Sequence, residues 1–472
     1  MHKFAAPCKL NITVYEREDH VGGRSTTVNV FGNISEPVEV GASIFVKVNR
    51  NLVSAVKRFD LSTISYSGDN LDGRTRAMGI WDGQKLVFLL NEESYNWWNL
   101  AKILWKYGLS AVRANSLMKG TVGKFLEMYE RPVFPFKSIE EAAHSVGLTA
   151  ASMLGEDFLA QNQIFAPFST DIIQASTRVN YAQNLNQIHG LEAMVCMAAE
   201  GGMSVHGGNW QIFDRMLKSA HNDVRLSTFV TDIIRNEDGE SYTIQSSSQR
   251  NSEDDKTTLT SIDTVDTVVI ATPLQFSNIT TKNLVKELPS PIPYVKLYVS
   301  LFTSPDFLFD VERLGLPAGS LLPTTLLTTL PSDGSEPPRF FSISTLRSIT
   351  NPDVDPPRRE YLYKIFSPRP LNLRSPDLGW GPESIEVTWE YHKVWHSYPF
   401  LPPRVTFDDP QLDDAGKLWY TSGIEPFITA METASLMGMN VAQLIVDKWT
   451  EEAADKAARS QAKGNDVAAS EL

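Results

Sequence analysis

The residues best suited to chemistry stand near the start of the chain, where an acid closes a short apolar run. Residues 12–16 read as a strand ending in Glu16, and Gly22, Gly23 and Arg24 follow a loop. In a nucleotide-binding α/β fold, an acid at the end of the second strand accepts hydrogen bonds from a ribose. Glycines let a ligand approach the backbone, and arginine can pair with phosphate. The pattern predicts a dinucleotide site, although a strand with a Gly-Gly turn and a surface arginine explains it too.

The stretch before Glu16 carries a second piece of information. A dinucleotide-binding fold places G-x-G-x-x-G about 20 residues before the ribose-binding acid, after a first strand. Here 15 residues precede Glu16, and residues 1–10 contain no glycine. We therefore expect the sequence to begin inside its βαβ unit, with the first strand and the phosphate loop absent.

Small residues recur after the next strand and before a helix. Gly41, Ala42 and Ser43 would permit close approach of a planar ligand, although a plain tight turn explains them equally well. A second glycine pair precedes a predicted helix start, where free N–H groups suit an electron-rich ligand; these residues are Gly207 and Gly208, with Asn209 as the expected helix cap.

The last motif couples a strand to a long helix. Gly423 allows a turn after the strand, and Glu425 follows it. A helix predicted over residues 428–449 would point its N-terminus, with Met431 and Glu432, at whatever lies beyond the strand.

Composition and charge narrow the class of protein. The chain has 472 residues, of which 42% are hydrophobic and 21% charged, so we expect a globular protein with two domains or one interleaved pair. A net charge of −13 argues against a general nucleic-acid binder. Cys8 and Cys196 form neither a disulfide framework nor a C-x-x-C motif. No apolar run approaches 18 residues, so we expect no transmembrane helix.

One pair of histidines raises the question of a metal. His392 and His396 lie four residues apart beside Glu390 and would share a face on a helix or a strand. No cysteine or acidic cluster completes a ligand set, so we expect no metal site.

A basic and aromatic segment covers residues 95–125. Aromatic side chains crowd its first half, and no acid occurs between Tyr95 and Phe125. Such a segment can contact a membrane surface, although a pair of core-facing helices with solvated lysines fits the same residues.

The order of the predicted elements divides the chain into interleaved parts. Residues 77–90 are predicted to form a hairpin and residues 178–185 a strand or loop, and long loops are expected at 304–338 and 351–383. The nucleotide-binding domain is assigned residues 1–90, 204–280 and 411–450; the substrate domain is assigned residues 91–203, which are helical, and 281–410, which form strands and loops; residues 451–472 are a flexible tail.

Three separated motifs resemble a known family. The order of the motifs is that of amine-oxidase-like flavoenzymes, and the middle of the chain narrows the resemblance. Val179-Asn-Tyr-Ala-Gln-Asn, the run 200–211 and Gly423-Ile-Glu with Ala430-Met-Glu-Thr-Ala are similar to prenylcysteine oxidase, also called prenylcysteine lyase. The resemblance extends from about residue 10 to residue 449. It implies an α/β FAD-binding dinucleotide fold, amine-oxidase-like, interleaved with an α+β substrate domain.

The resemblance also implies a reaction and roles for residues. The family uses FAD and oxygen to oxidise the thioether of farnesyl- or geranylgeranyl-cysteine to prenyl aldehyde, cysteine and hydrogen peroxide. The positions carried over are Glu16 for the ribose; Gly22, Gly23 and Arg24 for the pyrophosphate; Gly41, Ala42 and Ser43 beside the flavin; the Val230 backbone for adenine; Glu425 and the amides of Met431 and Glu432 at the flavin end; and Gly207, Gly208 and Asn209 at the reaction face.

Two other functions and a compartment complete the expectations. The missing phosphate loop points to an incomplete gene model of an active oxidase, or else to a polypeptide that binds FAD poorly. An amine oxidase with another substrate and a flavin-free binding protein are the alternatives. Sequons at Asn11, Asn33 and Asn278, with the family resemblance, favour a lysosomal, vacuolar or secreted protein.

Overall fold

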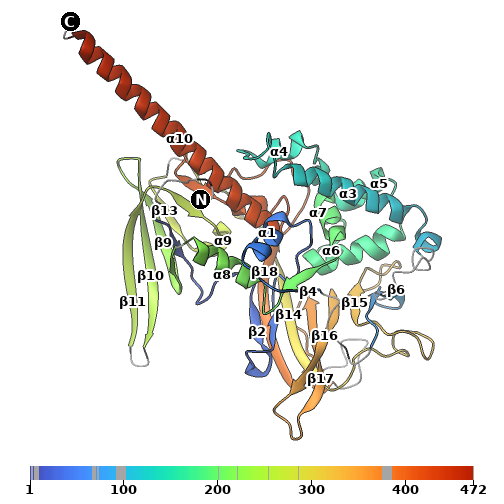
Figure 1. Cartoon of the computed structure of the whole chain (residues 1–472). Helices are drawn as coiled ribbons and strands as arrows, with labels where there is room; N and C mark the ends of the chain where they lie inside the picture. Colours follow the sequence, from blue (N-terminus) through green and yellow to red (C-terminus); the bar gives the residue numbers. More distant parts are fainter. Residues whose placement is uncertain are drawn as a thin grey trace.

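The computed structural model describes residues 1, 4, 10–65, 71, 74–91, 103–199, 201–220, 222–252, 255–284, 286–374 and 385–470. Within these residues a large sheet, a group of helices over one of its ends, and a set of smaller sheets lie side by side (Figure 1). The long helix α10 projects away from all three and carries the C-terminus to its far end (Figure 1).

The smaller sheets contain the predicted nucleotide-binding strands. Parallel pairing joins β1 (Thr13–Tyr15) to β8 (Asp223–Arg225), and β12 (Val268–Ile270) to β19 (Leu418–Tyr420). A four-stranded sheet has the order β11-β10-β9-β13; its strands are β9 (Thr228–Arg235), β10 (Tyr242–Ser252), β11 (Asp255–Val265) and β13 (Thr280–Lys282). The strands β10 and β11 pair along their whole length as an antiparallel hairpin.

Short strands and helices complete this half of the molecule. Two antiparallel pairs are formed by β2 (Thr27–Asn29) with β3 (Pro37–Glu39), and by β4 (Thr63–Ser65) with β7 (Met203–Val205). The helices and 3₁₀ turns here are η1 (Val30–Gly32), α1 (Arg50–Arg58), α8 (Trp210–Ser219), α9 (Leu274–Ser277), η6 (Ser422–Ile424) and α10 (Met431–Ser470).

The large sheet has seven strands in the order β18-β14-β17-β16-β15-β5-β6. Its strands are β5 (Ala77–Trp81), β6 (Leu86–Asn91), β14 (Tyr294–Ser304), β15 (Thr325–Thr328), β16 (Ser342–Asn351), β17 (Arg358–Ser367) and β18 (Trp389–Pro399). Alternation along β14 sends Leu297, Val299 and Leu301 into a core shared with β3. This core attaches the large sheet to the smaller ones.

The predicted hairpin over residues 77–90 is confirmed, but its domain assignment is wrong. β5 pairs in parallel with β15, so β5 and β6 extend the large sheet. The first boundary therefore lies before residue 77 and not at residue 90.

A second correction concerns β17, which lies where a long loop was predicted. It pairs with both β14 and β16. Prolines on both sides of β17 hid its alternating pattern in the sequence.

Helices cover one end of the large sheet (Figure 1). They are α3 (Ser110–Glu127), α4 (Ile139–Ser145), η2 (Ala150–Ser152), α5 (Gly155–Gln161), the π-helix η3 (Ser169–Ile173), α6 (Gln174–Tyr181), α7 (Gly190–Val195) and η4 (Cys196–Ala198). The Ser138 side chain caps α4, because it accepts a hydrogen bond from the Glu141 N–H. The first half of residues 178–185 was misassigned, because α6 continues to Tyr181 with buried residues on its inner face; the second half is a loop, as the prediction allowed.

The C-terminal helix is longer than its sequence pattern indicated. We predicted an end near Trp449 and a flexible tail, yet α10 continues to Ser470. The apolar repeat stops near Trp449, but the following residues are rich in Ala, Glu and Lys, which are strong helix formers even on an exposed surface.

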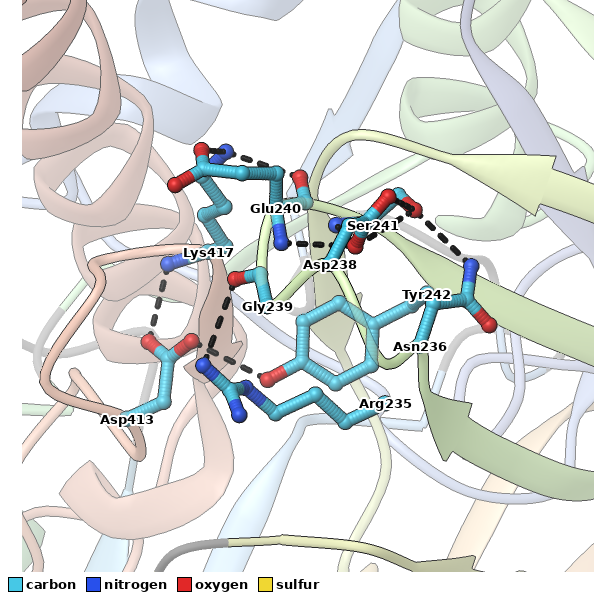
Figure 2. A network of polar contacts seen from close by, with 9 residues as sticks. All are labelled: Arg235, Asn236, Asp238, Gly239, Glu240, Ser241, Tyr242, Asp413 and Lys417. Atoms are coloured by element: carbon cyan, nitrogen blue, oxygen red, sulfur yellow. Dashed lines mark hydrogen bonds and ion pairs between the residues drawn. The ribbon is translucent and has the colours of Figure 1, made fainter.

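A polar network ties the four-stranded sheet to the strand before α10 (Figure 2). The Tyr242 hydroxyl donates to the Asp413 carboxylate at 3.0 Å, and the same carboxylate accepts the Lys417 N–H at 2.8 Å. The Lys417 ammonium reaches the Glu240 carbonyl at 2.8 Å. These contacts hold the segment that precedes β19, and η6 follows β19 in the chain.

Glu432 connects α10 to α1 and to the helical group. Its buried carboxylate accepts the N–H groups of Asn51 and Leu52 at 2.9 and 3.1 Å, and the Tyr129 hydroxyl at 2.6 Å. The two N–H groups belong to the first turn of α1, which has no side-chain cap of its own.

Replacing Glu432 with Ala is therefore expected to lower the free energy of unfolding by about 2–4 kcal/mol, because it leaves one buried and two partly buried donors unpaired. Urea unfolding measures the effect. Glu451→Ala, an exposed position on the same helix, should change stability by less than about 0.5 kcal/mol. Equal effects of the two substitutions would contradict the capping role.

Candidate active site

Glu16 stands at the end of β1, as the sequence predicted. Its backbone N–H donates to the Arg225 carbonyl, and its carbonyl accepts from the Thr228 N–H, both at 2.9 Å. The Glu18 N–H donates to Oε1 at 2.9 Å. Within the described chain no donor is seen on Oε2, so the carboxylate can still accept a ribose hydroxyl. Val230 lies two residues after Thr228 on β9, close to this strand end.

The predicted Gly22–Gly23 turn places Arg24. The Ser25 N–H donates to the Gly22 carbonyl at 2.9 Å, and both glycines have positive φ, 129° and 57°. A Cβ on Gly22 would lie 2.2 Å from the Ser25 carbonyl oxygen, whereas a Cβ on Gly23 would meet open space. Gly22 is thus required by the turn itself, and Gly23 by its left-handed backbone.

Arg24 forms a bidentate ion pair with Glu425, which the sequence did not predict. Nη2 lies 2.7 Å from Oε1, and Nη1 lies 2.9 Å from Oε2 and 2.7 Å from the Ser397 carbonyl. The Tyr294 hydroxyl donates to Oε2 at 3.0 Å. Burial opposes the charge on Arg24, but Glu425 outweighs burial and holds the pKa of the guanidinium above its ordinary value. The contact joins two residues that were predicted at different parts of the cofactor.

Gly41, Ala42 and Ser43 pack directly on the Arg24 turn. The Ala42 N–H donates to the Arg24 carbonyl at 2.9 Å, and a Cβ on Gly41 would lie 1.9 Å from that oxygen. The Ser43 hydroxyl donates to the Gly41 carbonyl at 2.8 Å. Gly41 is therefore needed for this contact between two backbones.

Asn209 binds the same loop from the other side. Its Nδ2 donates to the Ala42 carbonyl at 3.0 Å, and its Oδ1 accepts the Val205 N–H at 2.8 Å. It precedes α8, as predicted, but its side chain caps no helix N–H. The N–H of Asn209 is instead bound by Glu39 Oε1, at 2.5 Å. Gly207 and Gly208 have φ of 86° and 118°, which bends the chain toward this contact.

Two buried titratable residues, Glu39 and Lys364, were missed by sequence reasoning. The Lys364 ammonium donates to the Ser43 hydroxyl at 2.7 Å and to the Glu39 carbonyl at 2.8 Å. Burial lowers the pKa of Lys364 to about 8, against the attraction of Glu39. Burial raises the pKa of Glu39 to about 7, against the Asn209 N–H and Lys364, and Glu39 Oε2 has no partner in the described structure. A lysine inside the apolar run Tyr361-Leu-Tyr-Lys-Ile-Phe was the available signal.

The C-terminal residues of the predicted site divide between two places. Glu425 joins Arg24, whereas the Glu432 side chain faces α1. Met431 packs in the core that contains Phe45. A Cβ on Gly423 would lie 2.7 Å from the Asp408 carbonyl oxygen, so this glycine is required by packing.

Neither a metal centre nor a membrane span is found in the described residues. No group of three histidine, cysteine or acidic side chains is placed to hold a metal among them. His392 and His396 both point to the exposed face of β18, where His392 contacts Ser300 and His396 lies on the Phe276 ring. No described helix is long and apolar enough to cross a membrane.

The comparison with known proteins first identifies the class of protein to which the fold belongs. Over 93% of both chains the structure resembles cyclohexylamine oxidase from Brevibacterium oxydans, with a TM-score of 0.56 and 15% sequence identity. Putrescine oxidase gives a TM-score of 0.54 over 92% of this chain, also at 15% identity. Residues 2–59 match the NAD(P)-binding Rossmann-like domain. The predicted fold class is thereby confirmed as that of the amine-oxidase-like enzymes.

The family follows from the sequence matches. Residues 90–457 match the prenylcysteine lyase model, and the chain belongs to that family. Farnesylcysteine lyase from Arabidopsis thaliana is 29% identical over 93% of this chain and 82% of its own length. Prenylcysteine oxidase 1 from Homo sapiens is 28% identical over 95% of this chain and 85% of its own length. The chain is thus an oxidoreductase whose cofactor is FAD.

The residues present fit this cofactor at its ribose and flavin ends. Glu16 offers a free carboxylate oxygen, and the turn at Gly23 is open where a side chain would otherwise stand. The loop 41–43 is built from small residues and is held by Asn209 and Lys364 from either side. These are positions at which backbone and small side chains can line a flat ring.

The buried acid in this site makes stability depend on pH. The folded pKa of Glu39, about 7, exceeds the unfolded value of 4.5, so the folded state binds the proton more tightly. Stability is therefore lost as pH rises from 4.5 to 7. Relative to Glu39→Gln, which keeps the acceptor for Asn209, the wild type should lose on the order of 1–3 kcal/mol over this interval. Denaturant unfolding at several pH values measures it.

Glu18→Gln serves as the matched control, because Glu18 is an exposed carboxylate on the adjacent segment. It should follow the wild type at every pH. A constant difference between the wild type and Glu39→Gln from pH 4.5 to 7 would contradict a raised pKa for Glu39.

Proposed function

We propose that this protein oxidises the thioether of S-farnesyl- or S-geranylgeranyl-cysteine, with water and oxygen as co-substrates, to the prenyl aldehyde, free cysteine and hydrogen peroxide. The match of residues 90–457 to the prenylcysteine lyase family is the observation that carries the proposal. The relatives named farnesylcysteine lyase and prenylcysteine oxidase add support.

Bound FAD supplies the two-electron oxidation of the carbon next to sulfur. The residues of this chain then have two tasks, which are to orient the thioether and to manage the proton that water releases when it adds to the oxidised carbon. Lys364 Nζ and Glu39 lie beside the loop 41–43 and have pKa values near neutral, so they can exchange a proton at physiological pH. Ser43 Oγ connects the lysine to that loop.

The reaction predicts a yellow protein that releases peroxide. We expect flavin absorbance in the protein purified with FAD and peroxide production with S-farnesylcysteine, together with equal amounts of free thiol and farnesal. Putrescine and cyclohexylamine are the comparison substrates, because an amine oxidase would oxidise an amine instead of the thioether. Peroxide from an amine but not from S-farnesylcysteine would favour the amine oxidase. A protein without flavin after reconstitution would favour a binding function.

We propose further that the protein takes its lipid-like substrate from a membrane surface. Five apolar side chains are exposed over the helical group; they are Leu104, Trp105, Leu109, Val112 and Phe165, with exposures from 37% to 90%. The fold brings Phe165 to this surface, since its N–H is bound by Ser110 Oγ. Arg113 and Lys119 flank it with positive charge. Residues 95–102 of the predicted segment lie outside the described residues.

Trp105→Ser with Leu109→Ser is expected to reduce binding to phosphatidylserine-containing vesicles by tenfold or more, on the order of what two buried apolar side chains contribute. Co-sedimentation measures the bound fraction. Ile34→Ser is the matched control, because Ile34 is 83% exposed outside this surface. Equal binding of the wild type and the double variant would contradict the membrane contact.

The proposed compartment is the lysosome, the vacuole or the extracellular space. It rests on the family and on the sequons, of which Asn11 and Asn33 are exposed. Glycan release should therefore shift the mass of the protein made in a eukaryotic host.

A further inference from the structure

Arg178 is a buried cation whose described partners are all neutral. It lies on α6 and is 4% exposed. Nε donates to the Thr328 carbonyl at 3.1 Å and to Thr328 Oγ1 at 3.3 Å, Nη2 donates to Thr328 Oγ1 at 3.2 Å, and Nη1 donates to Asn184 Oδ1 at 3.0 Å. A guanidinium has five N–H donors. One N–H on each of Nη1 and Nη2 is thus left without an acceptor among the described residues.

The charge of Arg178 is uncompensated by the protein around it. No carboxylate in the described residues forms an ion pair with it, and burial lowers its pKa to about 10. A buried charge is costly unless an opposite charge or a full set of hydrogen bonds accompanies it. Arg24, the other arginine of the site, has such a partner in Glu425. Arg178 therefore lacks the anion that its environment calls for.

The position of Arg178 connects it to the candidate active site. Its guanidinium lies 5.1 Å from the centre of the Phe341 ring, and the Phe341 N–H donates to the Phe366 carbonyl. The Phe366 ring lies 5.0 Å from the Lys364 ammonium, which binds Ser43. Phe341 and Phe366 belong to the same core. A continuous line of contacts thus runs from Arg178 to the loop 41–43.

The backbone around Arg178 has the irregularity expected of a binding element. The π-helical turn η3 immediately precedes α6, and Ala182, whose φ is 53°, follows the last residue of α6. π-Helical turns are frequent at functional sites, and a left-handed non-glycine residue costs free energy that the surrounding contacts must offset. Arg178 therefore lies on a regular helix that is flanked by irregular backbone on both sides.

We propose that Arg178 binds the α-carboxylate of the prenylcysteine substrate. The inference rests on the proposed function and names the group that recognises the amino-acid head. The carboxylate supplies the missing negative charge, and its two oxygens match the two free N–H groups. The contacts through Phe341 and Phe366 connect this position to Lys364 and Ser43.

The test compares three substrates that differ only in the head group, which are S-farnesylcysteine, its methyl ester and S-farnesylcysteamine. The wild type is expected to prefer S-farnesylcysteine by roughly 10- to 100-fold in kcat/KM, mainly through KM. In Arg178→Gln the three values should converge to within about threefold, and Arg178→Lys should retain part of the preference. Arg347→Gln is the matched control, because Arg347 is a partly buried arginine on β16 that pairs with Glu36.

Calorimetric titration of the protein with its flavin reduced and oxygen excluded, using the same three compounds, gives a readout that needs no turnover. A wild type without preference, or an Arg178→Gln variant that keeps the full preference, overturns the inference. If Arg178→Gln does not fold, the wild type and Arg178→Lys decide the question by the same criterion. Absence of peroxide with all three compounds would refute the proposed function, whereas the binding preference would still test Arg178.

Discussion

The ion pair between Arg24 and Glu425 is the contact on which the site depends. It joins the first glycine turn to the segment before α10, and through Tyr294 and Ser397 it also reaches β14 and β18 of the large sheet. Glu425 is buried, so removal of either partner would leave a charge without compensation. Four segments from both halves of the molecule are thereby held at one point, beside the loop 41–43.

Most of the local structure could be predicted from the sequence, because local structure follows local periodicity and turn chemistry. β1, the hairpin of β5 and β6, and the start of α8 were placed from a few residues each. The contacts that build the site could not be predicted, because Arg24 and Glu425 are 401 positions apart in the sequence and Lys364 and Ser43 are 321 positions apart. One sequence carries no signal for such pairs, and for the same reason β5 was assigned to the nucleotide-binding domain although it pairs with β15 of the large sheet.

The glycines have a structural role that the sequence analysis did not foresee. We attributed Gly22, Gly23 and Gly41 to close approach of a ligand, and Gly423 to a turn. Backbone oxygens of Ser25, Arg24 and Asp408 occupy the space that side chains at Gly22, Gly41 and Gly423 would need. These glycines are therefore required by loops packing on one another, and Gly23, where space is open, is the glycine whose surroundings leave room for a ligand. The glycine motifs therefore determine first how the loops pack, and only second how the cofactor is contacted.

Buried positive charge limits the positions in which the substrate can bind. A prenyl tail gains about 0.8 kcal/mol for each buried CH₂, but that gain is nearly the same if the tail slides along an apolar surface. Oxidation at one carbon requires a fixed register, which an apolar tail cannot supply alone. Lys364 is bound to Ser43, whereas Arg178 on α6 lies 5.1 Å from the Phe341 ring and has no counter-charge among the described residues. An anionic group at one end of an apolar substrate would set that register.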